Sequence, residues 1–197
     1  MNLYNNYWWF KNAFTPEQCD RIIKMGMYEN FELGDINRNN KRTVEEEDKE
    51  DLFKTRNSHV SWIDEPWIYN ILKKYIDSAN KSAGWNYDWD WTEMLQFTKY
   101  DVGQFYDWHP DQHHYVYPED DTNVNMRGKY RKLSSTLLLN DPSEFEGGDL
   151  EFHYNRKDQC VAKELNTQGS LVVFPSPSLS ISSAQSVSQV SLLPAPK

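Results

Sequence analysis

The sequence is poor in cysteine and has no long apolar run. Its two cysteines, Cys19 and Cys160, lie far apart, so they indicate neither a disulfide framework nor a paired zinc motif, and they favour a reducing compartment. No stretch of about 18 uninterrupted apolar residues occurs, which excludes a membrane-spanning helix. The first residues also lack the basic and apolar segments of a signal peptide. We therefore expect a cytoplasmic protein without a membrane partner.

Positive charge is scarce as well. The chain has 21 Lys and Arg against 30 Asp and Glu, for a formal net charge of -9. A protein that binds nucleic acid without sequence preference needs basic surface to neutralise phosphates, so we expect no nucleic-acid partner. The acidic run Glu45–Asp48, followed by Glu50 and Asp51, either attracts a cationic substrate or forms a solvated loop. Nothing in the sequence indicates the oligomeric state.

Aromatic residues are abundant, at 15% of the 197 residues, with eight Trp and twelve Tyr. A chain of this length is the size of one domain and buries ~70% of the surface that it exposes when unfolded. Such a composition suits a small β domain whose aromatic side chains line a cavity or pack on sheet faces. The cluster Trp85, Tyr87, Trp89 and Trp91 fits either a binding groove or the core.

The first part of the chain predicts two helices. Thr15-Pro16-Glu17-Gln18 combines a hydroxyl cap, a proline at the first helical position and a glutamine three residues after the cap. A second helix is predicted from Pro66, with apolar residues at 3.6-residue spacing, and it ends at Gly84. Residues 32–58 are polar and without periodicity, which indicates a long surface excursion.

From Thr92 onward the pattern changes to strands. Short β-prone runs occur at residues 93–100, 133–139, 149–152 and 170–175, separated by turn residues such as Asn140-Asp141-Pro142. Strands at this spacing after a helical front predict a mostly β, α+β chain folded as a sandwich or jelly roll. Residues 177–197 are rich in Ser and Pro and contain no aromatic residue, which predicts a disordered tail.

One segment could carry metal chemistry. In an extended strand, residues two apart point to the same side, so His109 and Asp111 would present an imidazole and a carboxylate to one cavity. With a second imidazole, these donors form the facial triad of non-haem Fe(II) oxygenases, which leaves positions open for a co-substrate and O₂. A single His-x-Asp is common, and a surface or core histidine is the alternative.

The motifs around this segment occur in a specific order. The chain closely resembles the prolyl 4-hydroxylase-like 2-oxoglutarate/Fe(II) dioxygenases, and within them the PKHD-type hydroxylase group. The motifs that carry the resemblance are Leu95–Tyr100, Gly103–Asp111, Arg131–Ser134, Glu144–Phe152 and Gly169–Ser176. The resemblance implies a double-stranded β-helix (jelly roll), with residues 1–91 as a helical support region, residues 92–176 as the dioxygenase core, and residues 177–197 as the tail.

The resemblance also implies functional residues. His109 and Asp111 would be the first two iron ligands, and Tyr100 would either donate a hydrogen bond to 2-oxoglutarate or pack as an ordinary aromatic. The implied cofactors are Fe(II), 2-oxoglutarate as co-substrate and L-ascorbate as a reductant. The implied reaction couples oxidative decarboxylation of 2-oxoglutarate to hydroxylation of a small-molecule or peptidyl substrate.

The chain departs from the family after Ser176. The family has a second histidine there and then an arginine for the distal carboxylate of 2-oxoglutarate, whereas this sequence continues Pro177-Ser178-Leu179-Ser180. His113, His114 or His153 could replace the histidine, but solvated or outer positions are more usual for such residues. Arg131 and Lys132 could reach the co-substrate, although surface charges are the simpler interpretation.

Two hypotheses explain this departure: a frameshift or gene-calling error that replaced the true end, or a genuine pseudo-enzyme. The first leaves a hydroxylase that is incomplete in this form. The second leaves a catalytically silent jelly-roll module that binds a ligand or partner. A cupin-like hydrolase or isomerase is a third interpretation, which only His113 and His114 favour.

Overall fold

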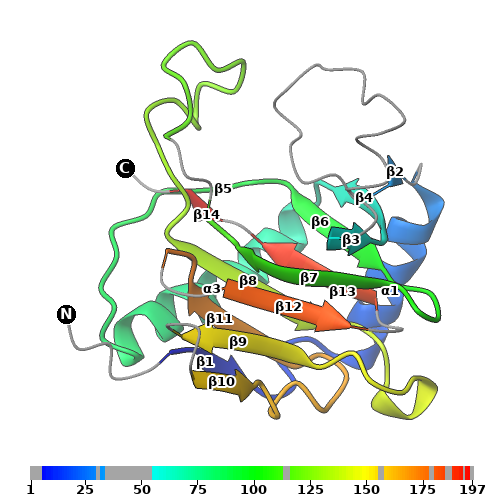
Figure 1. Ribbon diagram of the computed structural model, residues 1–197. Coiled ribbons are helices and arrows are strands. Elements are labelled where there is room, and N and C mark those ends of the chain that lie inside the picture. The colour runs from blue at the N-terminus through cyan, green and yellow to red at the C-terminus, as the bar shows by residue number, and fades with distance from the viewer. Residues whose placement is uncertain are drawn as a thin grey trace.

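The computed structural model describes residues 6–29, 32–33, 55–112, 116–154, 158–177, 180–184, 188–192 and 194–195. This part of the chain is mostly β, with two long helices, two main sheets and a short 3₁₀ helix, η1 (Pro142–Glu144). In Figure 1 the five-stranded sheet lies in front of the seven-stranded sheet, and both helices lie behind. The mostly β character agrees with the prediction from the sequence.

Every strand pair in these sheets is antiparallel. The larger sheet has the order β1 (Trp8–Phe10), β11 (Leu171–Pro175), β8 (Leu133–Leu138), β13 (Ser188–Leu192), β6 (Leu95–Lys99), β4 (His59–Ile63) and β2 (Glu32–Leu33). The smaller sheet has the order β10 (Asp158–Val161), β9 (Leu150–Tyr154), β12 (Ser180–Ala184), β7 (Phe105–Pro110) and β3 (Arg56–Asn57). A two-stranded pair joins β5 (Trp91–Thr92) to β14 (Pro194–Ala195).

The two helices begin where the sequence predicts them. At the start of α1 (Pro16–Tyr28), Thr15 Oγ1 accepts from the main-chain N–H of Gln18 at 3.3 Å, and Gln18 Oε1 accepts from the main-chain N–H of Thr15 at 2.9 Å. These bonds satisfy N–H groups that have no partner within the helix. The second helix, α3 (Pro66–Ser82), is followed by Gly84 at φ +73°. A glycine adopts this left-handed conformation readily, and it ends the helix.

The helices pack on one face of the larger sheet. Leu95 and Phe97 of β6 belong to the apolar cluster that α1 and α3 complete. The alternating residues Gln96 and Thr98 therefore face the smaller sheet, because successive side chains of a strand point to opposite faces. Trp85 is buried in the same cluster, with Tyr87 and Trp89 packed against it, so these aromatics serve the core rather than a groove.

The space between the two sheets has two different ends. At one end lies a second apolar cluster formed by residues of β9, β11 and β12 and one neighbouring loop residue. Its buried members are Leu150, Phe152, Ala162, Val172, Phe174 and Ile181. At the other end lie polar side chains, including Gln96 and Thr98, which share a 2.9 Å hydrogen bond, and Ser134, whose Oγ lies 2.7 Å from Ser176 Oγ. The polar end holds the candidate site described below.

The N-terminal region does more than supply helices. Three of its strands join the larger sheet, and β3 joins the smaller one next to β7. The polar excursion predicted at residues 32–58 begins in β2 and ends in β3. Its middle, including the acidic run Glu45–Asp51, lies outside the described residues. In the described part of the chain, no helix has the length and apolar character needed to cross a membrane.

The C-terminal segment differs from the expected disordered tail. Strand β12 pairs with both β7 and β9, and β13 pairs with both β6 and β8. Ladder hydrogen bonds use main-chain groups, which a serine supplies as well as any other residue. The composition argument considered side chains only and therefore did not reveal this pairing.

Candidate metal centre

A β-bulge in β7 shapes the site. His109 pairs with Ile181 of β12, and Tyr106 pairs with Ser183, so the register shifts between the two pairs. Three steps along β7 thus match two along β12, and the extra residue brings Tyr106 and His109 to the same side of the strand. Their rings stack with a centroid separation of 3.4 Å and an interplanar angle of 10°. The guanidinium of Arg56 lies 4.4 Å above the same tyrosine ring.

The His109 ring is held in one tautomer. Its Nδ1 lies 2.7 Å from the carbonyl oxygen of Asp107. A carbonyl can only accept, so Nδ1 carries the hydrogen and the lone pair is on Nε2, as in many metal-binding histidines. Burial lowers the pKa of His109 below its ordinary value; Asp111 and the Asp107 carbonyl oppose this shift, while Arg56 and Arg131 add to it. The neutral imidazole is the form that can bind a metal.

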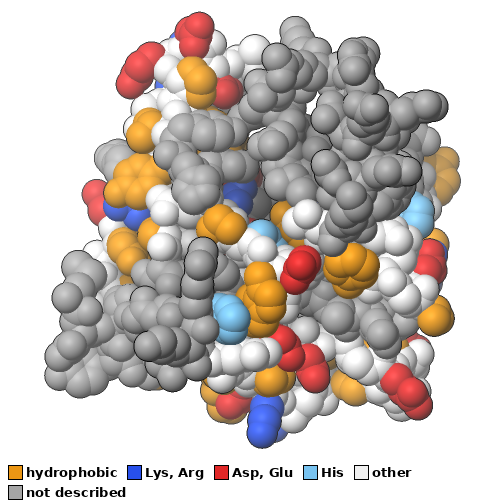
Figure 2. All heavy atoms as spheres, in the orientation of Figure 1, with side chains coloured by type: hydrophobic (Ala, Val, Ile, Leu, Met, Phe, Trp, Pro, Cys, Tyr) orange, Lys and Arg blue, Asp and Glu red, His pale blue; other side chains and the backbone are white. Residues whose placement is uncertain are grey.

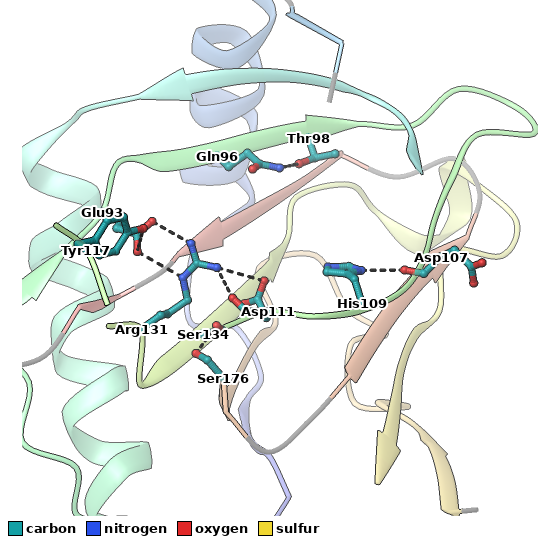
Figure 3. Close-up of polar contacts among 10 residues, drawn as sticks. All are labelled: Glu93, Gln96, Thr98, Asp107, His109, Asp111, Tyr117, Arg131, Ser134 and Ser176. Carbon is teal, nitrogen blue, oxygen red and sulfur yellow. Dashed lines mark hydrogen bonds and ion pairs between the residues drawn. The ribbon is translucent and has the colours of Figure 1, made fainter. Parts of the chain in front are cut away.

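Asp111 follows the last residue of β7. Its side chain is 14% exposed, and its Oδ1 lies 3.6 Å from Nη1 of Arg131. Figure 3 shows the His109 and Asp111 side chains on the same side of β7, in the space between the sheets. Burial is the largest cause that raises the pKa of Tyr106 to about 12, and the charge of Asp111 contributes to the same rise. The structure therefore brings together the imidazole and the carboxylate that the sequence pairs.

Arg131 is buried, and its expected role as a surface charge is wrong. It is 6% exposed, and its Nη2 and Nε lie 2.9 Å and 3.3 Å from Oε2 and Oε1 of Glu93. Burial disfavours the charged guanidinium, but the carboxylates of Glu93 and Asp111 raise the pKa of Arg131 above its ordinary value. Tyr117 donates to Glu93 Oε1 at 3.2 Å. Lys132 instead lies over the ring of Tyr130, 4.2 Å from its centroid.

Sequence reasoning missed Arg56, Glu93, Tyr106 and Tyr117 as parts of this site. Arg56, Glu93 and Tyr117 come from segments that only the folded chain brings to His109 and Asp111, whereas Tyr106 lies inside the Gly103–Asp111 motif and reaches His109 through the bulge in β7. Tyr100, for which the sequence leaves co-substrate binding and ordinary aromatic packing open, is 7% exposed. The ionised form of Tyr100 would contribute to the raised pKa of Tyr106, after burial and Asp111.

A third metal donor is not found in the part of the chain that the structure describes, where no three His, Cys, Asp or Glu residues gather as a metal site. His153 stacks on Trp108 with centroids 4.0 Å apart. Because its neighbour Phe152 faces the interior, His153 faces the outer side of the sheet. Ile181 of β12 is the cross-strand partner of His109, and it is 8% exposed. His113 and His114 lie outside the described residues.

The fold is shared with solved hydroxylases. A viral collagen prolyl hydroxylase from Paramecium Bursaria Chlorella virus-1, solved with 2-oxoglutarate, is 17% identical, with a TM-score of 0.58 and coverage of 97% of this chain and 96% of that chain. A Pseudomonas putida prolyl-4-hydroxylase is 16% identical, with a TM-score of 0.61 and coverage of 98% and 93%. A Trichoplax adhaerens prolyl hydroxylase is 16% identical, with a TM-score of 0.57 and coverage of 96% and 83%.

The sequence itself gives one family match. A search of the curated proteins finds no match to this chain. The model of the 2OG-Fe(II) oxygenase superfamily matches residues 95–192. That range begins at β6, contains His109 and Asp111, and ends with β13. The chain therefore belongs to the 2OG-Fe(II) oxygenase superfamily.

Proposed function

We propose that this chain is an Fe(II)- and 2-oxoglutarate-dependent dioxygenase of the hydroxylase type, in a form that lacks part of the family's active site. The reaction would couple oxidative decarboxylation of 2-oxoglutarate to hydroxylation of a substrate. The observation that carries this proposal is the placement of His109 and Asp111 on one side of β7, between the sheets and beside Tyr106.

The proposed core is a double-stranded β-helix. From β6 to β13 the chain passes back and forth between the sheets, except that the consecutive strands β9 and β10 pair in the same sheet: β6, β8, β11 and β13 lie in the larger one, and β7, β9, β10 and β12 in the smaller one. A chain that moves back and forth in this way builds two facing sheets with a cavity between them. The division into a support region (1–91), a core (92–176) and an aberrant tail (177–197) remains part of the proposal, together with the PKHD-type subgroup.

The donors present fit Fe(II) in kind but not in number. A neutral imidazole from His109 and a carboxylate from Asp111 are two of the three protein ligands of a facial triad. When bound, iron would supply the activation of O₂ that amino-acid side chains do not provide. This chain's residues would hold the ligands in place: the Asp107 carbonyl fixes the His109 tautomer, and Tyr106 stacks on its ring. Tyr100 would donate its hydroxyl to 2-oxoglutarate.

The missing parts are a third ligand and an arginine for the co-substrate. After Ser176 the sequence contains no His, Cys, Asp, Glu or Arg, and a serine hydroxyl is a poor Fe(II) ligand beside imidazole and carboxylate. Our preferred explanation is a frameshift beyond the codon for Ser176. Translating the other two frames of the DNA tests it, because one of them should encode a His followed by an Arg. If neither does, the frameshift explanation is wrong.

Anaerobic titration with Fe(II) and 2-oxoglutarate tests the function directly. An oxygenase site gives a weak visible charge-transfer band under argon, and succinate once air is admitted. We expect a weak band for this chain and a stronger one for a version with the corrected end. His109→Gln and Asp111→Asn should abolish the band, whereas His153→Gln, on the outer face, should not change it. A band that survives both ligand substitutions would refute the proposal.

A second candidate function is a catalytically silent jelly-roll module that binds a ligand or partner. The observation that favours it is Ile181, an apolar side chain where a ligand to a metal beside His109 could stand. Such a module gives neither the charge-transfer band nor succinate, even with the two sheets intact. Circular dichroism on the same sample would separate it from an unfolded chain.

The remaining expectations are also proposals. The Trichoplax adhaerens protein was solved with a peptide fragment of a hypoxia inducible factor, which supports a peptidyl substrate here, alongside small molecules. L-Ascorbate is proposed as the reductant. Among the side chains that the structure describes, those of Lys and Arg are few and scattered on the face shown in Figure 2, which supports the expectation of no nucleic-acid partner. The proposed location is the cytoplasm.

A further inference from the structure

The buried ion pair beside the candidate ligands connects three separate segments. Glu93 lies between β5 and β6, Arg131 lies two residues before β8, and Asp111 follows β7 directly. The side chains of Glu93 and Arg131 are 11% and 7% exposed. Figure 3 shows Arg131 between the carboxylates of Glu93 and Asp111, with Tyr117 next to Glu93.

Glu93 fixes the orientation of the guanidinium. It accepts from Nε and Nη2 of Arg131, at 3.3 Å and 2.9 Å, through both of its oxygens. Such a fork-to-fork pair allows one plane and one direction for the guanidinium. The Tyr117 hydroxyl, 3.2 Å from Glu93 Oε1, holds the carboxylate in turn. The remaining nitrogen of Arg131, Nη1, then points at Asp111.

Asp111 receives two contacts from that nitrogen. Nη1 donates to the main-chain carbonyl oxygen of Asp111, and it lies 3.6 Å from the carboxylate Oδ1. Strand β7 ends at Pro110, which pairs with Ser180, so the β ladder stops one residue before Asp111. Arg131 therefore acts on this residue where the sheet no longer constrains its main chain.

We propose that Arg131 is a positioning residue: clamped by Glu93 and Tyr117, it fixes the main chain and the carboxylate of Asp111 before any metal binds. The inference rests on the proposed function only in treating Asp111 as a metal ligand. Residues that orient a metal ligand typically change metal affinity about 10- to 100-fold when they are removed.

A structural ion pair without a positioning role is the competing explanation. Substituting one partner alone would leave the other charge buried and unpaired, and could unfold the chain for that reason. The informative variant is therefore Glu93→Gln combined with Arg131→Met, which removes both charges and keeps a similar volume. The matched control is Asp90→Asn combined with Lys129→Met. Lys129 Nζ lies 2.9 Å from Asp90 Oδ2, and Lys129 is two residues before Arg131 in the sequence, so the control removes a neighbouring ion pair.

Amide hydrogen exchange on the metal-free chain gives a readout independent of activity. We expect the Glu93/Arg131 double variant to exchange at least about 10-fold faster at Asp111 and Gln112, with β6 and β8 unchanged, since only the local hold on Asp111 is lost. The Asp90/Lys129 control should exchange like the unmodified chain at all of these positions. Unchanged exchange at Asp111, or equal acceleration throughout the sheets, would overturn the proposal.

Mn(II) binding, measured by electron paramagnetic resonance, is the second arm. We expect the Glu93/Arg131 double variant to bind Mn(II) about 10- to 100-fold more weakly than the unmodified chain. Tighter binding would mean that the guanidinium only repels the metal, and it would overturn the proposal. If the unmodified chain binds no Mn(II), the proposed metal site fails, while the exchange experiment still decides the role of Arg131.

Discussion

Gly26 of α1 lies directly against the ring of Phe97 of β6. A Cβ atom added at Gly26 would lie 2.5 Å from Cδ2 and 2.6 Å from Cδ1 of Phe97. Carbon atoms in van der Waals contact are about 3.5–4.0 Å apart, so the helix would have to move away from the sheet by roughly 1 Å. The same movement would stretch the buried hydrogen bond that Ser61 Oγ donates to the Gly26 carbonyl at 2.8 Å.

We predict that Gly26→Ala lowers the free energy of unfolding by about 1–3 kcal/mol. Overpacking typically costs about 1–3 kcal/mol, and a weakened hydrogen bond costs about 1 kcal/mol. Against this, Ala is favoured over Gly inside a helix by about 1 kcal/mol. In a urea titration followed by Trp fluorescence, a slope of about 2 kcal/mol/M converts the loss into a midpoint lower by roughly 0.5–1.5 M.

Two further variants make this prediction sharp. Lys24→Ala, on the exposed face of the same helix, should change stability by less than about 0.5 kcal/mol. Adding Phe97→Leu to Gly26→Ala should recover part of the loss, because a smaller side chain makes room for the new methyl group, and a double-mutant cycle measures this coupling. A higher urea midpoint for Gly26→Ala would show that helix propensity outweighs the contact and would refute the reasoning.

Three other predictions concern the site, a buried thiol and a helix cap. Ile181→His should place a second imidazole beside His109, because directly opposed residues have Cβ atoms about 4.5–5.5 Å apart. Co(II) added to this variant should then give a stronger visible spectrum than Co(II) added to the unmodified chain. Equal spectra would argue against the pairing. Burial raises the pKa of Cys19 to about 12, above the value of about 8.5 for a thiol in the unfolded chain. The contribution of Cys19 to the free energy of unfolding should therefore be complete below about pH 8.5 and be lost as the pH rises towards 12. Alkylation at pH 8 should therefore label the partly exposed Cys160 before Cys19, and equal rates would contradict this. Thr15→Ala removes the capping bond and should cost about 1 kcal/mol in thermal or urea unfolding, whereas an unchanged midpoint would show that the cap is not needed.

The parts of the fold that could be predicted are those with local signals. The capping residues at Thr15 and the turn glycine at position 84 mark helix boundaries through main-chain hydrogen bonds and a left-handed φ, which depend on a few neighbouring residues. The predicted strand runs 133–139 and 170–175 became β8 and β11, adjacent in the larger sheet. The family motifs, in their order along the chain, then implied how such strands would combine.

The parts of the site that could not be predicted depend on long-range pairing. Arg131 looks like a surface charge at the start of a strand, and only the approach of Glu93, 38 residues earlier, makes it a buried partner. Tyr106 and His109 would face opposite sides of a regular strand, and the bulge opposite β12 brings their rings together. A two-residue periodicity cannot reveal a bulge, because its register shift exists only relative to a partner strand.

The C-terminal segment shows why fold and activity are separate questions for this chain. The pairing of β12 and β13 with their neighbours uses main-chain N–H and C=O groups, and Ser180 and Ile181 provide them as a histidine would. Holding Fe(II) instead requires one particular nitrogen at one position near His109. A change of sequence after Ser176 can therefore preserve the pairing of β12 and β13 and still remove a ligand. The likeness to solved prolyl hydroxylases consequently shows the fold alone, and the Ile181→His variant asks the separate question of whether a nitrogen opposite His109 would bind a metal.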